Sequence, residues 1–384
     1  MSRVWWSVAP SGPCGRLSWV MAQPFQVCID VAHPGTTQEE WYDLRGDGST
    51  QYYLKHWYPT DPSTKEVAQP KAAVVFVHGF ADYCDRYTGV FRVFPDRGIQ
   101  VSGFDQLGFG RTWHESPNRA TTHGWTSWPD QFRDVSCMLR LTRARLDERW
   151  GKDTVPLYLM GHSMGGGITA AFFTRDPASP PEEEVKQLVS GAILMSPWLD
   201  IHFPIPTAVG IPVMRSVLRW FPTIKLPLGP PSKDLCRESA VVQDARVNPL
   251  SSCYVHVRCL YGPLSGGPQI VAEDYRRWPE RLPLLICHGT GDKVTRWDCS
   301  KKLYDHLKGL GRSVQLVSFT GFYHEAIFEP GQDKVLFAQT LVDWVEKQVE
   351  ARGQPLPPAN CLGCTSAAAD DSVRDELGGR RGGR

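Results

Sequence analysis

Residues 155–173 read Val-Pro-Leu-Tyr-Leu-Met-Gly-His-Ser-Met-Gly-Gly-Gly-Ile-Thr-Ala-Ala-Phe-Phe, and this stretch decides the fold. A short apolar run of strand length enters a Gly-x-Ser-x-Gly turn, and a helix of small residues follows at once. This context predicts a nucleophile elbow, in which Ser163 stands on a strained turn at the carboxyl edge of a sheet. Gly161 and Gly165 have a steric role there, because a Cβ would collide with neighbouring backbone. In the alternative, a plain glycine-rich connection, the serine would only cap the helix.

Strand-like and helix-like segments alternate on both sides of the elbow. Continuous apolar runs such as 72–77 are typical of strands buried on both faces of a parallel sheet. Further strands are expected at 100–104, 192–195, 283–288 and 314–319, and helices at 87–97, 129–150, 300–310 and 334–350. This alternation predicts a doubly wound, mostly parallel sheet with right-handed crossovers. At the start, 41–45 and 52–58 flank a Gly-Asp-Gly-Ser turn, which predicts an antiparallel hairpin.

The alternation breaks once, over residues 197–279. This segment is rich in proline, aromatic residues and short apolar pieces, and it lies between two core strands. We therefore expect a cap inserted over the carboxyl edge of the sheet. The chain then divides into a disordered leader (1–38), the first part of the core (39–196), the cap (197–279), the second part of the core (280–350) and a disordered tail (351–384). A poorly formed signal sequence is the alternative for the leader.

Composition narrows the class of protein. With 41% hydrophobic and 22% charged residues, the 384-residue chain can bury a sizeable core. A net charge of +1 gives no electrostatic footprint for nucleic acid, so we expect no nucleic-acid partner. The eleven cysteines have no repeated spacing, and Cys361-x-x-Cys364 lacks the second pair of a zinc site. Reduced thiols, a cytosolic setting, and no metal or other cofactor are expected.

A serine hydroxyl is a poor nucleophile and needs a base, which in turn needs an orienting acid. At an elbow of this kind the chain order is serine, acid, histidine, so both partners must follow Ser163. His324 is the expected base, because it stands in the loop after the last strand and Gly321 frees that backbone for a turn. The alternatives are a surface-loop role for His324, with His288 at a strand end as the fallback base.

Asp292 is the expected acid, since it closely follows a strand in a Gly-rich turn. Its carboxylate could accept from the imidazole Nδ1–H and hold the correct tautomer. Aspartate in such a turn is often only a turn former, and Asp200, after the preceding strand, is the competing position. For the oxyanion hole we expect the backbone N–H of Met164, next to the nucleophile, and that of Phe80. His78 is expected to be structural and hydrogen-bonded.

The sequence resembles the monoacylglycerol lipases of the α/β-hydrolase group (serine aminopeptidase S33 and lysophospholipase-like proteins). The matching pieces lie within residues 40–348: His78-Gly79 with Asp85-Arg86-Tyr87, Asp105-x-x-Gly108-x-Gly110, Gly161-His-Ser-Met-Gly-Gly166, Gly291-Asp292 and Tyr323-His324. The resemblance implies an α/β-hydrolase fold with the cap between strands 6 and 7. It also implies Ser163, Asp292 and His324 as the catalytic triad, with the N–H groups of Phe80 and Met164 as the oxyanion hole.

Three features depart from the pattern of that group. Phe80 replaces the small residue usual after His-Gly, Gln106 stands where a histidine is usual, and the cap carries an extra segment at 254–267. These departures leave the chemistry intact and bear on the glyceride preference. In addition, the cap segments 209–214 and 217–221 are apolar with interspersed arginines, so the cap either forms an acyl tunnel resting on a lipid surface or simply packs on the core.

The expected function is that of a serine hydrolase. It would cleave monoacylglycerols to free fatty acid and glycerol through an acyl-enzyme. A lysophospholipase, a general carboxylesterase, and a non-catalytic lipid-binding protein of the same fold are the alternatives. The expected partner is the lipid substrate, and the expected location is cytoplasmic. A peripheral location, with the cap in contact with endoplasmic reticulum or lipid-droplet surfaces, is the further expectation.

Overall fold

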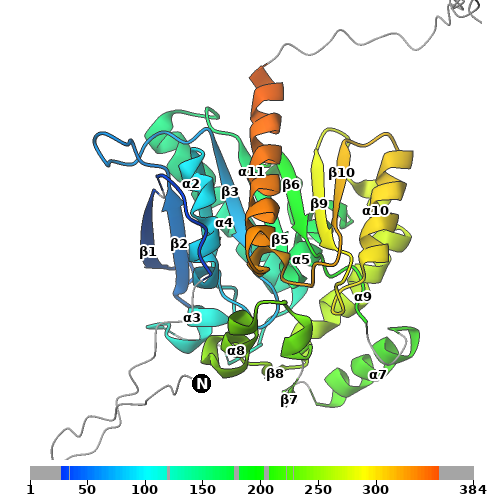
Figure 1. Ribbon diagram of the computed structural model, residues 1–384. Helices are drawn as coiled ribbons and strands as arrows, with labels where there is room; N and C mark the ends of the chain where they lie inside the picture. Colours follow the sequence, from blue (N-terminus) through cyan, green and yellow to red (C-terminus); the bar gives the residue numbers. More distant parts are fainter. Residues whose placement is uncertain are drawn as a thin grey trace, which may run out of the picture.

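A computed structural model of the chain describes residues 27–33, 35–118, 122–176, 181–202, 207–221, 223–227 and 229–353 (Figure 1). Eight strands form one sheet in the order β1-β2-β4-β3-β5-β6-β9-β10. Their bounds are β1 Thr36–Tyr42, β2 Tyr52–Tyr58, β3 Ala72–Val77, β4 Ile99–Phe104, β5 Leu157–His162, β6 Gly191–Met195, β9 Leu284–Gly289 and β10 Val314–Phe319. β1 and β2 form the expected antiparallel hairpin, although β1 shares only residues 41 and 42 with the strand expected at 41–45. β2 pairs antiparallel with β4, and all other pairs of this sheet are parallel. The predicted mostly parallel sheet is confirmed.

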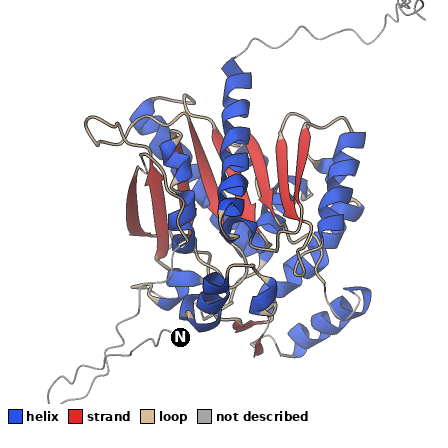
Figure 2. Cartoon of the chain, in the orientation of Figure 1, coloured by secondary structure: helices blue, strands red, loops and turns tan. Residues whose placement is uncertain are grey.

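Helices cover both faces of the sheet, as Figure 2 shows. Successive residues of a strand point to opposite faces, so each continuous apolar run feeds two separate core clusters. Val75 and Leu159 pack toward α4 (Trp128–Trp150), α5 (Met164–Thr174) and α10 (Trp297–Gly309). Phe76 and Met160 pack toward α1 (Thr88–Phe91), α2 (Val93–Asp96) and α11 (Gln332–Gly353). The helix expected at 87–97 is divided into α1 and α2, preceded by the 3₁₀ turn η1 (Cys84–Tyr87).

The predicted insertion lies between β6 and β9, the sixth and seventh strands of the large sheet in chain order. It contains α7 Thr207–Trp220, β7 Lys225–Pro227, η2 Ser232–Asp234, α8 Ser239–Val247, η3 Pro249–Ser251, β8 Tyr254–His256, α9 Arg258–Ala272 and η4 Asp274–Arg277. Most of these elements gather at one end of the sheet, the lower end in Figure 1. α9 differs, because its apolar residues Leu260, Leu264 and Ile270 join the same core cluster as α5. Part of the predicted cap therefore belongs to the body of the protein.

The predicted leader of 1–38 is too long. Val27 and Ile29 are 6% and 4% exposed, and the N–H of Ile29 donates to the carbonyl of Gly89 at 3.0 Å. Two apolar side chains are too few to form a recognisable pattern in the sequence, but they belong to the same core cluster as the residues of α1. Residues 1–26 of the leader and 354–384 of the tail lie outside the described residues, while 351–353 continue α11. The remaining elements of the core are α3 (Gly110–His114), α6 (Glu183–Lys186) and the 3₁₀ turn η5 (Ala326–Phe328). No helix within the described ranges has the length and apolar character to cross a membrane.

Candidate active site

The turn between β5 and α5 has the geometry that the glycine spacing predicts. Ser163 adopts φ 53° and ψ −115°, a conformation that costs a non-glycine residue energy and is typical of functional turns. A Cβ on Gly161 would lie 2.2 Å from the carbonyl oxygen of Gly165, and one on Gly165 would lie 2.1 Å from that of Val77. The strand and helix can therefore approach this closely only with glycine at both positions.

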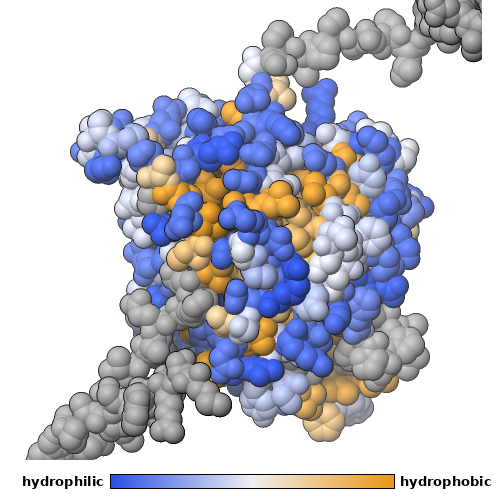
Figure 3. Space-filling model, in the orientation of Figure 1, coloured by the Kyte–Doolittle hydropathy of each residue, from blue (hydrophilic) through white to orange (hydrophobic). Residues whose placement is uncertain are grey.

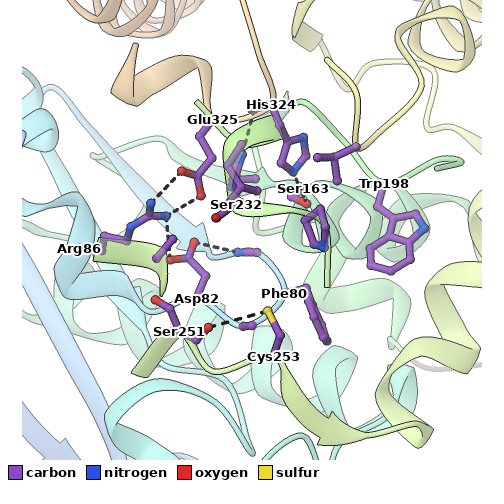
Figure 4. A pocket seen from close by; sticks show the side chains of 17 residues that line it. Phe80, Asp82, Arg86, Ser163, Trp198, Ser232, Ser251, Cys253, His324 and Glu325 are labelled. Carbon is purple, nitrogen blue, oxygen red and sulfur yellow. Dashed lines mark hydrogen bonds and ion pairs between the residues drawn. The ribbon is translucent and has the colours of Figure 1, made fainter. Parts of the chain in front are cut away.

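Three buried side chains from separate loops meet at this turn. Nε2 of His324, in the loop after β10, lies 2.8 Å from Oγ of Ser163. Nδ1 of the same ring lies 2.8 Å from Oδ2 of Asp292, in the loop after β9. The exposed fractions are 6% for Ser163, 6% for Asp292 and 3% for His324. Figure 4 shows the His324 ring directed at Ser163. This is the alcohol–imidazole–carboxylate arrangement that activates a serine nucleophile.

The carboxylate of Asp292 is held from several directions. Its Oδ1 accepts the backbone N–H groups of Val294 at 2.7 Å and Thr295 at 2.9 Å, and its Oδ2 accepts the hydroxyl of Thr295 at 2.8 Å. His288 Nε2 lies 3.1 Å from the same Oδ2. Burial alone would raise the pKa of Asp292, but the neighbouring His324 and His288 hold it well below its usual range. The acid is therefore ionised at neutral pH and can orient the ring.

The two histidines beside Ser163 have opposite pKa shifts. Burial alone would lower the pKa of His324, but the charge of Asp292 and the hydrogen bond to it raise the pKa above its usual value. Burial, and then the charge of His324, lower the pKa of His162 to about 4. Nδ1 of His162 faces the hydroxyl of Tyr87 at 3.0 Å. Of this pair, His324 has the geometry of a base.

The other candidates for base and acid lie elsewhere. Nδ1 of His288 meets the hydroxyl of Ser300 at 2.8 Å and its Nε2 faces Asp292, so both ring nitrogens are engaged away from Ser163. Asp200 lies beside Arg296, at 3.7 Å, instead of beside a histidine. The structure therefore brings the favoured residues together, whereas His288 contacts Asp292 instead of Ser163 and Asp200 contacts Arg296.

The expected oxyanion donors lie on either side of Ser163. Met164 is the first residue of α5, and the first N–H groups of a helix have no acceptor within it. Phe80 follows Gly79, where a Cβ would stand 3.3 Å from Cβ of Ser163. Phe80 and Ser163 line the same cavity, and Met164 directly follows Ser163 in the chain.

That cavity has a volume of about 240 Å³ and two chemically different sides (Figure 4). Phe80 and Trp198, whose ring centroids lie 6.5 Å apart, form an apolar side. The polar side consists of Asp82, Arg86, Glu325 and the cap residue Ser232.

Arg86 is one of the cavity residues for which the sequence predicts no role. Its guanidinium makes two hydrogen bonds to Glu325, at 2.6 and 2.7 Å, and an ion pair with Asp82 at 3.5 Å. The only sequence signal for it was the Asp85-Arg86-Tyr87 piece of the resemblance. Among the described residues, no three His, Cys, Asp or Glu side chains are grouped to hold a metal ion.

Comparison with known proteins identifies the family and several relatives of the chain. A profile of the family described as Serine aminopeptidase, S33, matches residues 68–331. A putative monoglyceride lipase of Schizosaccharomyces pombe is 29% identical, over 76% of this chain and 70% of its own. The monoacylglycerol lipase of Mycolicibacterium smegmatis is 26% identical, over 79% of this chain and 96% of its own. A soluble variant of the Saccharomyces cerevisiae monoglyceride lipase, solved with a substrate analog, superposes with a TM-score of 0.67 at 20% identity, over 85% of this chain and 99% of its own, which shows a shared fold.

Proposed function

The chain belongs to the serine aminopeptidase S33 family of α/β-hydrolases, and on that premise we propose that it cleaves monoacylglycerols to free fatty acid and glycerol. The observation that carries the proposal is the contact of His324 Nε2 with Ser163 Oγ at 2.8 Å, backed by Asp292. The monoglyceride lipases among its relatives support the choice of substrate.

In the proposed reaction, Oγ of Ser163 attacks the ester carbonyl while Nε2 of His324 takes the hydroxyl proton. The negative charge on the carbonyl oxygen is received by the N–H groups of Phe80 and Met164. The C–O bond to glycerol then breaks, and His324 returns the proton to the leaving oxygen. Water attacks the acyl-enzyme in the same way and releases the fatty acid. Asp292 stabilises the imidazolium in both halves and keeps its own charge.

The two sides of the cavity favour an amphiphilic substrate. We propose that the acyl chain lies against Phe80 and Trp198, and that the glycerol hydroxyls face Asp82, Arg86 and Glu325. Hydroxyl groups can both donate to the carboxylates and accept from the guanidinium, so a neutral diol suits this mixed set. Because Leu235 and Ser232 come from the segment 197–279, the proposed cap completes the cavity.

The outer surface of the cap favours contact with a lipid surface, either a membrane or a lipid droplet. Trp220 and Phe221, at the end of α7, are 73% and 63% exposed, and Tyr254 is 57% exposed. Figure 3 shows apolar side chains at the lower edge of the molecule, where β7 and α7 lie. Basic residues Arg219 and Lys225 stand among them. Co-sedimentation with phospholipid vesicles should fall for the Trp220→Ser/Phe221→Ser variant, whereas equal sedimentation of both proteins would contradict the contact.

A substrate panel with wild type and Ser163→Ala tests the hydrolysis. The substrates are a monoacylglycerol, lysophosphatidylcholine and short p-nitrophenyl esters. Fastest turnover of the monoacylglycerol, lost in Ser163→Ala together with fluorophosphonate labelling, supports the proposal. Fastest turnover of either other class would make the protein a lysophospholipase or a general carboxylesterase. A wild type that turns over none of them would overturn hydrolysis in favour of lipid binding.

A further inference from the structure

Gln106, where the related group usually has a histidine, lies beneath the loop that carries Phe80. Its backbone N–H donates to Nε2 of His78 at 2.9 Å, and its side-chain amide donates to the carbonyl oxygen of His78 at 2.8 Å. Gln106 is 1% exposed and His78 is fully buried. A single residue therefore holds both the ring and the main chain of His78.

The bond to Nε2 determines where the His78 ring carries its proton. A backbone N–H can only donate, so Nε2 accepts and the neutral ring is protonated on Nδ1. Nδ1 lies 2.8 Å from the carbonyl oxygen of Gly79 and donates to it. The carbonyl of Gly79 and the N–H of Phe80 belong to one planar trans peptide and point in opposite directions. By holding that carbonyl, His78 holds the Phe80 N–H in one orientation.

A second glutamine extends this network toward the other proposed donor. The carbonyl of His78 can only accept, so Gln106 presents its NH₂ there and its Oε1 to Gln131, whose Nε2 lies 3.1 Å away. The same nitrogen of Gln131 lies 3.8 Å from Sδ of Met164. Gln131 is on α4 and 1% exposed. Two side-chain amides therefore join the loop of Phe80 to the side chain of Met164.

One atom of this network has no hydrogen-bond partner among the described residues. Within the described part of the chain, Oε1 of Gln131 is buried without a hydrogen-bond partner. Leaving such an acceptor unsatisfied typically costs about 1–3 kcal/mol. An apolar side chain at position 131 would remove that cost, but it would also leave the buried Oε1 of Gln106 without its donor. Gln131 therefore completes the hydrogen bonding of Gln106.

We propose that Gln106 and Gln131 are positioning residues that orient the two N–H donors of the oxyanion hole, Gln106 through His78 and Gln131 through Gln106 and Met164. The inference rests on the proposed ester hydrolysis by Ser163. Neither glutamine touches the substrate. Their effect falls on the tetrahedral intermediate, whose oxyanion the two N–H groups receive, and leaves ground-state binding unchanged.

The test compares Gln106→Met and Gln131→Met, which keep the size of the side chain and remove the amide. Gln100→Met is the matched control, because Gln100 is also buried and its amide donates to Ser102 at 3.1 Å, near the start of β4. Enzyme concentrations are set by titration with a fluorophosphonate, so that misfolded protein is not counted. The measurements are kcat and KM on one ester, and inhibition by a trifluoromethyl ketone, whose adduct carries an oxyanion.

Loss of a whole oxyanion donor costs about 10²–10³ in kcat, so misorienting one should cost about ten- to a hundredfold. We expect kcat and the affinity for the trifluoromethyl ketone to fall together in Gln106→Met, and by less in Gln131→Met, with KM unchanged. Gln106→His, which restores an N–H donor, should recover part of the loss. Gln100→Met should match wild type.

Two results would overturn the inference. If both glutamine variants keep the kcat and inhibitor affinity of wild type and lose only thermal stability, their role is structural. If KM rises while kcat stays constant, they act on substrate binding. A wild type that hydrolyses no ester would instead refute the proposed function, and this inference with it.

Discussion

Oδ2 of Asp292 lies 2.8 Å from Nδ1 of His324, although the two residues are 32 positions apart in the chain. The carboxylate is also held by the backbone N–H groups of Val294 and Thr295. The ring is therefore oriented by an acid that cannot itself rotate freely. Because the orientation of the ring depends on this fixed carboxylate, substitution of Asp292 is the first test.

Asp292→Asn should reduce kcat by about 10⁴-fold, because an amide at this position favours the wrong tautomer of the imidazole. Asp200→Asn is the matched control, since Asp200 contacts Arg296 instead of a histidine, and it should retain activity close to wild type. Steady-state kinetics on a single ester checks both. A larger loss in Asp200→Asn than in Asp292→Asn would reverse the assignment of the acid.

The pH dependence of activity should follow the raised pKa of His324. Burial favours the neutral ring, but the charge of Asp292, the hydrogen bond to it and the charges of Glu325 and Asp82 together lift the pKa above the usual 6.5. A general base works only when neutral, so kcat/KM should fall as the pH drops through this raised pKa. In Asp292→Asn the lost charge should move that limb to lower pH. A limb at the same pH in both proteins would show that another group controls it.

Gly165→Ala should abolish the folded elbow. The new Cβ would stand 2.1 Å from the carbonyl oxygen of Val77 and 2.5 Å from that of His78. Both are backbone atoms, which cannot move aside as a flexible side chain could. Gly309→Ala is the control, because a Cβ at that helical position meets nothing within 4 Å. It should add up to about 1 kcal/mol to the free energy of unfolding. Yield, circular dichroism and fluorophosphonate labelling measure the outcome, and a fully labelled Gly165→Ala would contradict the steric argument.

Glu325→Gln should destabilise the protein, because it leaves the buried guanidinium of Arg86 without its main partner. Removing one member of a buried ion pair costs about 3–5 kcal/mol. Asp82, 3.5 Å away, compensates only in part, so we expect the lower end of that range. Asp305→Asn, in a pair whose side chains are 45% and 53% exposed, should change stability by less than about 1 kcal/mol. Urea unfolding compares them, and equal losses would mean that the Arg86 pair behaves as a surface pair.

Phe80→Ala should extend the range of acyl chains that the site accepts. The Phe80 ring lies 5.9 Å from that of Phe109 and 6.5 Å from that of Trp198, between centroids, and occupies part of the cavity. Its removal widens the apolar side, whereas the backbone N–H remains. The ratio of kcat/KM for long-chain over short-chain esters should rise. An unchanged ratio, with intact kcat, would place the acyl chain elsewhere.

The sequence by itself determined those features that depend on a few neighbouring residues. The glycines around Ser163 encode a close strand–helix approach, and the alternating apolar runs encode a parallel sheet with covered faces. The motif also indicated Met164 directly, because it is the residue after the nucleophile. Each of these signals is local, since sterics and periodicity act over one or two turns of chain.

Only the tertiary structure decided which distant side chains meet. His288 and His324 both follow strands, and it is the sheet order β5-β6-β9-β10, with the loop after β10 folded back, that brings His324 and not His288 to Ser163. Arg86 and Glu325 are separated by 239 positions. Contacts across such separations depend on sheet order and loop closure. No short stretch of sequence contains the information that determines either.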